Sequence, residues 1–225
     1  MEFRAAPGTG MLRPQPTIFQ SEDLKTLAVI TNWGAPSATQ KVIESVKDLF
    51  AAEVVDLDKT QVRNPSAKVA VELPIEFQLA EAIRSANESI YRSENENKVN
   101  TVLEVAILYQ SQGVLYWARA GLPHILLGTK NEEIGRFEPL SVCAEVVVSF
   151  KEPIPLPTMG IGLDLFPNIQ CGSVSVNSEM RLTLISAPAQ LLPNMGQVVH
   201  SLEGISQCIT SCFPQQPFWI GTAEL

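Results

Sequence analysis

Apolar residues in the first half of the chain recur every three or four positions, which is the period of a helix. A first stripe predicts a helix that Ser37 caps and that ends near Ala52. A second stripe predicts a helix over residues 75–90. Both follow a short apolar run at residues 27–31, which is typical of a buried strand. The first half is therefore expected to be a strand followed by two amphipathic helices.

Polar segments separate these elements. Residues 32–36 contain Gly and Pro and predict a turn between the strand and the first helix. Residues 56–67 are polar and predict a loop, and residues 93–100 predict a solvated connection after the second helix. Each polar run is thus explained by its place between two elements.

The second half of the chain changes to the pattern of short strands. Strands are predicted at residues 102–109, 114–118, 125–127, 146–150, 174–176, 182–185 and 218–223. A turn at residues 110–113 makes the first two a hairpin, another turn at 121–123 precedes the third, and residues 198–212 have helical spacing. Two helices, a strand-rich meander, a late helix and a final strand predict an α+β fold of antiparallel sheets covered by helices.

The chain is expected to be one domain with a short leading arm. Residues 1–17 carry several Pro and Gly residues and no continuous apolar segment, so they do not predict a secretory signal. We assign residues 1–23 to a flexible N-terminal arm, of native or cloning origin, and residues 24–225 to a single domain.

Composition and charge exclude several classes of partner. The chain has 16 Lys and Arg against 24 Asp and Glu, which gives a formal net charge of −8 at pH 7. Nucleic-acid binding requires clustered basic side chains, and the sequence has no such cluster. Its apolar runs are far shorter than the roughly 20 residues that span a bilayer. The sequence therefore predicts a cytoplasmic protein that binds neither nucleic acid nor membrane, and it leaves the oligomeric state open.

The chain has four cysteines, Cys143, Cys171, Cys208 and Cys212. Without a secretory signal, a disulfide framework is not expected. Cys208 and Cys212 are four residues apart and share one helix face, but two thiols without a nearby third ligand make a weak zinc site. We interpret all four as ordinary buried thiols.

Two segments in the middle of the chain, residues 79–91 with Ala-Asn at 86–87 and residues 101–127, resemble the metal-dependent protein phosphatase superfamily, which contains the 2C-type and the sporulation-stage-II-type serine phosphatases. Residues 79–91 look like the helix that ends in the family's Ala-Asn phrase, and residues 101–127 look like its central hairpin. The hairpin continues as Ala-Gly-Leu-Pro-His at residues 120–124. This is closer to the Ala-Gly-His-Pro of the sporulation-type branch than to the Gly-Asp-Ser-Arg of the 2C-type branch.

Later segments extend the resemblance over residues 24–225. Residues 157–162 and 181–186 look like the family's Leu-Gly phrase and the strand before its Asp-Gly motif, and residues 218–223 look like its last strand. The shared order implies a four-layer αββα sandwich, in which an antiparallel β-sandwich is flanked by helices. Members hold two divalent metals at one end of the sandwich, where the metals activate a water that attacks phosphoserine or phosphothreonine.

The resemblance implies carboxylates at three positions of that metal site, because Mg²⁺ and Mn²⁺ favour carboxylate oxygens. Asn32, two residues before Gly34, stands at the first position, and Ala187 stands at the second. Gln215 and Gln216 stand at the third. The resemblance therefore implies a degenerate member with no metal-binding acids, no catalytic residues and no metal cofactor.

The resulting hypothesis is a catalytically inactive, 2C-like pseudophosphatase domain with a regulatory or protein-binding role in bacterial signalling. Its ligand would be a protein partner or a phosphopeptide. Trp33, Gly121, His124 and Ser186 would line a ligand groove at the former metal end, or would simply fill the space of a lost site.

Two alternatives remain open. The first is an active, divergent serine/threonine protein phosphatase that uses Mg²⁺ or Mn²⁺. The only histidines are His124 and His200, and a lone His without supporting partners is more often structural than catalytic. The sequence also has no Gly-x-Ser-x-Gly nucleophile motif. The second alternative is a structural assembly subunit, which would carry a large exposed apolar patch.

Overall fold

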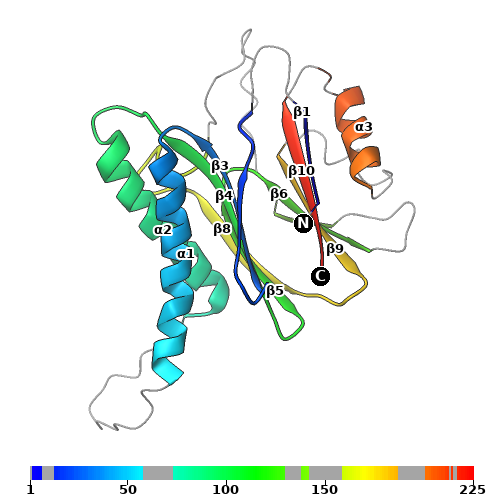
Figure 1. The fold of residues 1–225 in the computed structure, drawn as a ribbon, viewed down its shortest axis with the longest axis horizontal. Helices are drawn as coiled ribbons and strands as arrows, with labels where there is room; N and C mark the ends of the chain where they lie inside the picture. The colour runs from blue at the N-terminus through cyan, green and yellow to red at the C-terminus, as the bar shows by residue number, and fades with distance from the viewer. Residues whose placement is uncertain are drawn as a thin grey trace.

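The computed structural model describes residues 2–6, 13–57, 73–129, 138–141, 159–186, 201–212, 214 and 217–225. These residues form two five-stranded antiparallel sheets that face each other, with helices on both outer sides (Figure 1).

Sheet I has the strand order β2-β3-β4-β5-β8. Its strands are β2 (Thr17–Gln20), β3 (Thr26–Trp33), β4 (Val102–Ser111), β5 (Val114–Ala120) and β8 (Ile169–Ser175). Sheet II has the strand order β1-β10-β9-β6-β7. Its strands are β1 (Glu2–Ala6), β10 (Phe218–Glu224), β9 (Met180–Ser186), β6 (His124–Thr129) and β7 (Glu138–Ser141). Each sheet thus combines strands from both halves of the chain.

The helices lie on the two outer faces of this pair of sheets. Helices α1 (Pro36–Leu57) and α2 (Ile75–Ile90) cover sheet I, and α3 (Leu202–Cys212) covers sheet II (Figure 1). A π-helical turn, η1 (Tyr91–Asn95), continues α2. The arrangement confirms the predicted α+β, four-layer αββα sandwich.

Strand alternation divides the core into three apolar layers, because successive side chains of a strand point to opposite faces. The layer under α1 and α2 contains Ile83 and Ile107, and the layer between the sheets contains Leu108 and Trp219. A third, smaller layer contains Ile209 of α3. Full burial of one such side chain contributes about 1.5–3 kcal/mol, so the layers together hold the sandwich closed.

The part of the chain that was assigned to a flexible arm is instead built into both sheets. β1 pairs with β10 along its whole length, and β2 pairs with β3 from Thr17 to Gln20. Arg13, just before β2, contacts residues of β4 and β9. The prediction of a flexible arm over residues 1–23 is therefore wrong for the described part of that segment, because its backbone completes two sheet ladders.

The remaining element predictions agree except at helix ends and at β8, which begins five residues before the strand predicted at 174–176. The strand predictions that fall in the described residues correspond to β3, β4, β5, β6, β8, β9 and β10. α1 begins at Pro36 and not after Ser37, and it continues to Leu57, into the predicted loop. The predicted strand at residues 146–150 lies outside the described residues. Helix ends are where sequence patterns are least precise, since the last turns have little packing to mark them.

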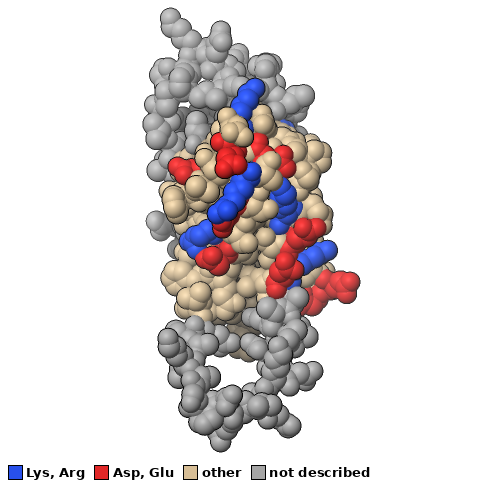
Figure 2. Space-filling view, turned by 90° about the vertical axis from the view of Figure 1, so that its left-hand side faces the viewer, with Lys and Arg blue, Asp and Glu red and all other residues tan. Residues whose placement is uncertain are grey.

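The face formed by α1 and α2 carries interspersed basic and acidic side chains (Figure 2). Arg84 pairs with Glu81, and Arg92 pairs with Glu88. Exposed pairs of this kind contribute little to stability. None of the described helices is long and apolar enough to cross a membrane.

The end of α2 holds a loop of residues 159–168 through Asn87, which is fully buried. Its Nδ2 atom donates to the carbonyl oxygens of Asp164 at 2.9 Å and Leu165 at 3.2 Å. Its Oδ1 atom accepts from the backbone N–H of Gly162 at 2.7 Å. One amide side chain thereby satisfies three backbone groups, which fixes the loop against the helix.

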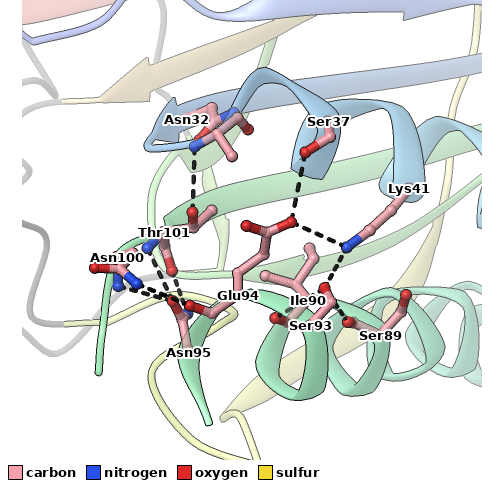
Figure 3. Close-up of polar contacts among 11 residues, drawn as sticks. Asn32, Ser37, Lys41, Ser89, Ile90, Ser93, Glu94, Asn95, Asn100 and Thr101 are labelled. Atoms are coloured by element: carbon pink, nitrogen blue, oxygen red, sulfur yellow. Dashed lines mark hydrogen bonds and ion pairs between the residues drawn. The ribbon is translucent and has the colours of Figure 1, made fainter. Parts of the chain in front are cut away.

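Asn95 of η1 also bonds this loop, and Figure 3 shows its contacts with Asn100 and Thr101. Its Nδ2 atom donates to the carbonyl oxygens of Thr101 at 2.5 Å and Gly162 at 2.7 Å, and its Oδ1 atom accepts from the backbone N–H groups of Asn100 and Thr101. Only 3% of Asn95 is exposed, so the prediction of a solvated connection over residues 93–100 is wrong at this residue. The side-chain amide replaces water as the partner of the buried backbone.

Gly162 lies where these contacts meet, and we expect Gly162→Ala to destabilise the fold. Gly162 has φ +92°, and an added Cβ would lie 2.6 Å from the Thr101 carbonyl oxygen. Gly113→Ala is the matched control, since its φ is +74° but its nearest neighbour would lie at 3.6 Å. The left-handed backbone costs each variant about 1–2 kcal/mol, and the clash adds about 1–3 kcal/mol in Gly162→Ala. Urea unfolding measures both, and equal losses would show that the loop is not held in place.

Candidate functional site

β3 and β9 end, and β4 begins, at the upper end of the two sheets in Figure 1, and we call this end of the inter-sheet layer the mouth. Hydrogen bonds join the polar side chains there. Thr31 follows the inward-facing Val29 on β3, and Ser186 follows the inward-facing Leu184 on β9. By the same alternation, Glu104 of β4 faces inward with Leu108. The sheet registers place Thr31 opposite Glu104 and Trp219 opposite Ser186. These four residues and Arg13 form the mouth cluster.

The mouth cluster joins the two sheets through two sets of contacts. Arg13 Nη1 donates to Glu104 Oε2 of sheet I at 2.7 Å and to Ser186 Oγ of sheet II at 2.6 Å. Trp219 Nε1 of sheet II donates to Thr31 Oγ1 of sheet I at 3.2 Å. Every member except Arg13 is almost completely buried. The mouth is therefore filled by side chains that are bonded to one another.

Arg13 is held in place by an aromatic ring as well as by hydrogen bonds. Its Cζ atom lies 5.2 Å from the centroid of the Trp33 ring, within the range of a cation–π contact. The side chain of Arg13 is 18% exposed and that of Glu104 is 3% exposed. A charge pair at this depth is stable only while both partners are present, because each desolvated charge alone is costly.

A second buried guanidinium lies beside the mouth. Arg119 of β5 is 2% exposed and follows the inward-facing Trp117. Its Nη1 atom donates to the carbonyl oxygens of Gly121 at 2.6 Å and Pro123 at 3.3 Å, and its Nη2 atom donates to Gln170 Oε1 at 2.5 Å. The side chain thereby fixes the turn between β5 and β6, where the chain passes from sheet I to sheet II.

Three of the four residues expected to line a ligand groove are buried. His124 is 1% exposed, Ser186 is 0% exposed and Gly121 is also buried. Of the four, Trp33 alone is partly exposed. Ser186 belongs to the mouth cluster, and Trp33 covers its arginine. His124 begins β6 and is 1% exposed, so it is packed within the fold and does not face solvent as an acid or base would.

Asn32 does not point into the mouth. Its Nδ2 atom donates to the carbonyl oxygen of Ala35 at 2.8 Å and to Thr39 Oγ1 at 3.0 Å, both at the start of α1. The inward-facing residue of this strand end is its neighbour Thr31, because strand residues alternate. The assignment of Asn32 to the first metal position is therefore wrong in orientation. Gly34 lies against Thr101, with an added Cβ only 2.5 Å from Thr101 Oγ1.

The other expected metal positions lie outside the described residues. These are Ala187, Gln215 and Gln216, and the second histidine, His200, is also outside them. Asp23 lies in the turn between β2 and β3, where Ser21 Oγ and the backbone N–H of Lys25 bond its carboxylate. The hydrogen bond from Ser21 is the main cause that lowers the pKa of Asp23. The Asp23 carboxylate therefore stabilises the turn between β2 and β3.

The described side chains do not fit a pair of divalent metals. Within the described ranges, no three His, Cys, Asp or Glu residues come together in a group that could hold a metal ion. Glu104 is the one carboxylate of the mouth cluster, and Arg13 is 2.7 Å from it. Mg²⁺ and Mn²⁺ need several oxygen ligands with negative charge, whereas the hydroxyls of Thr31 and Ser186 carry none.

A separate polar group lies between α1 and η1 (Figure 3). The Lys41 ammonium contacts Ser93 Oγ and lies 3.3 Å from Glu94 Oε1. A Ser–Lys pair serves as a nucleophile and base in some hydrolases. Here both side chains have further partners, since Lys41 pairs with Glu94 and Ser93 Oγ donates to the carbonyl oxygen of Ser89 at 2.7 Å. This group therefore links two helices.

The cysteines of α3 do not form a metal site in the described structure. Cys208 and Cys212 are free thiols, and Cys208 is partly buried while Cys212 is exposed. Burial is the main cause that raises the pKa of the Cys208 thiol, and the neighbouring Cys212 adds to it. Burial also raises the pKa of Cys171, which lies on β8. Thiols with raised pKa values are poor nucleophiles and poor metal ligands at neutral pH.

Sequence reasoning missed the three charged residues of this region, namely Arg13, Glu104 and Arg119. Glu104 gave a usable signal, since it is the only charged residue in the apolar run of residues 102–108. An acid on the buried face of a strand needs a partner, and the pattern predicts that need without naming the partner. Arg13 gave no signal, because it lies in a segment with no periodic pattern.

Comparisons with known proteins agree on the fold. No family model matches the chain, and no curated protein matches it. Solved structures do match over nearly the whole length. The serine/threonine phosphatase PstP/Ppp of Mycobacterium tuberculosis matches with a TM-score of 0.60 at 12% identity, covering 100% of this chain and 97% of that one. The chain has the fold of the metal-dependent serine/threonine phosphatases.

Two further phosphatase-fold structures match equally well. The phosphatase MsPP of Mycobacterium smegmatis, solved with cacodylate, has a TM-score of 0.60 at 12% identity, covering 100% of this chain and 97% of that one. PppA of Pseudomonas aeruginosa, a key regulatory component of a type VI secretion system, has a TM-score of 0.59 at 10% identity, with 100% and 96% covered. At these identities the likeness carries the fold and not the chemistry of the site.

The orientation of Asn32 can be tested by Asn32→Asp. Both Asn32 contacts use its Nδ2 as a donor, so a carboxylate would face two oxygens, and we expect a loss of about 1–3 kcal/mol of unfolding free energy. Asn177→Asp is the control, since Asn177 Oδ1 accepts from the backbone N–H of Glu179 at 3.0 Å and an aspartate keeps that bond. Urea unfolding with and without Mn²⁺ measures the effect. Recovery of Asn32→Asp stability by Mn²⁺ would place this residue at a metal site.

Proposed function

We propose that the chain is a pseudophosphatase: a domain with the phosphatase fold that does not hydrolyse phosphoesters and instead has a regulatory, protein-binding role. The mouth cluster is the observation that carries this proposal. Where two metals would require several carboxylates from both sheets, the described residues of the mouth include one, Glu104, and it is paired with Arg13. The other inward-facing groups there are Thr31, Ser186 and Trp219, which are neutral.

Physical chemistry supports the loss of turnover in this arrangement. Metal-dependent hydrolysis needs a metal-bound water whose pKa is lowered, and the metals must be held by negative ligands. Among the described residues, His124 is buried, and the Lys41–Ser93 pair is engaged with Glu94 and Ser89, which supports the absence of another base or nucleophile. We therefore propose that the domain acts by binding a protein partner or a phosphorylated segment.

The alternative is an active serine/threonine phosphatase that uses Mn²⁺ or Mg²⁺, and the likeness in fold favours it. A PstP catalytic domain of this fold was solved with two manganese ions, with a TM-score of 0.55 at 12% identity, covering 98% of this chain and 96% of that one. A protein that binds metals in that way would need acids from residues outside the described ranges. The cytoplasmic location and the place in bacterial signalling stay predictions.

Enzyme assays separate the two candidates. We expect no hydrolysis of p-nitrophenyl phosphate or of a phosphothreonine peptide above the protein-free rate at millimolar Mn²⁺, because the described mouth offers one carboxylate that is already paired. An active phosphatase of the same fold serves as the positive control. Turnover that a chelator abolishes would establish the active alternative.

A further inference from the structure

Arg13 occupies an unusual place for a residue that precedes an edge strand. The segment before β2 brings its guanidinium into the mouth, where it contacts a residue of each sheet. Its partners Glu104 and Ser186 lie on β4 and β9, which belong to different sheets. A single side chain thus bridges the whole inter-sheet layer at this end.

The chemistry of this bridge matches what a bound cation would do there. A cation between the sheets would neutralise Glu104 and draw oxygen ligands from both sides, as divalent ions do with carboxylates and hydroxyls. The guanidinium is a permanent cation with donors in a planar fork, so it offers the same charge with fixed directions. It lies 2.7 Å from the Glu104 carboxylate and 2.6 Å from the Ser186 hydroxyl, and the Trp33 ring covers it.

We propose that Arg13 is a built-in cation that closes the mouth by linking sheet I to sheet II, and that divalent ions therefore do not stabilise this protein. The inference concerns what holds the mouth together and does not depend on what partner the domain binds. Loss of the Arg13 cation leaves the Glu104 carboxylate, 3% exposed, without the charge that now lies beside it. Removing both charges also removes the free-energy cost of burying the Glu104 carboxylate.

Thermal unfolding of four variants tests the proposal. Arg13→Met should lower Tm by at least about 6 °C, because removing one partner of a buried pair is far costlier than removing a surface charge. Arg13→Lys, which keeps the charge but loses the planar group over the Trp33 ring, should fall between Arg13→Met and the wild type. The double variant Arg13→Met/Glu104→Gln should recover at least about half of the Arg13→Met loss, and Glu104→Gln completes the cycle.

Arg84→Met is the matched control. Arg84 also pairs with a glutamate, Glu81, but both side chains are more than half exposed. Its Tm should stay within about 2 °C of the wild type. The wild-type Tm should also stay within about 2 °C when Mn²⁺ or Mg²⁺ is added at millimolar concentration, since a saturated metal site would raise it by several degrees.

Four results would overturn the proposal. The first is an Arg13→Met variant with the same Tm as the Arg84→Met control, and the second is an Arg13→Lys variant with a Tm no higher than that of Arg13→Met. The third is a double variant whose loss of Tm equals the sum of the two single losses. The fourth is a wild-type Tm that rises when Mn²⁺ is added. If Arg13→Met does not fold, folding of the double variant supports the proposal and its failure overturns it. None of these Tm measurements uses phosphatase activity, so the proposed function is tested separately.

Discussion

Every side chain that points between the two sheets must be apolar or must find a polar partner within the same layer. This constraint governs the whole sandwich, because water is excluded there and an unpaired charge is costly. Along most of the layer the solution is apolar, with Leu108, Leu184 and Trp219 packed together. At the mouth the solution is polar, and the pair of Arg13 and Glu104 satisfies it.

The same constraint relates the fold to its chemistry. In a metal-dependent phosphatase the end of the sandwich would gather acids that only bound cations make tolerable. In this chain the cation belongs to the protein, and the acids are reduced within the described mouth to Glu104. The chain therefore shares the architecture of PstP and PppA, and the likeness in fold does not fix the chemistry of the mouth.

The Asn87 and Asn95 contacts show how a loop supports this end of the molecule. Both amides hold the loop of residues 159–168 through Gly162, and that loop bonds Leu103, the neighbour of Glu104, by two hydrogen bonds to Ile161. The position of the acid in the mouth thus depends on side chains of α2 and η1. The sequence indicated an Ala-Asn phrase at this place, but it gave no reason to connect Asn87 with a loop 75 residues away.

Period and alternation in the sequence determined the helices and strands, because both patterns repeat over residues close together in the chain, whereas the four-layer order was implied by the family resemblance. The helix stripes and the runs at β4, β5 and β9 were readable for this reason. Tertiary structure alone decided the partner of Glu104, the inward turn of Thr31 in place of Asn32, and the ordering of the segment around Arg13. Those outcomes depend on contacts between residues up to 188 positions apart, which no local pattern encodes.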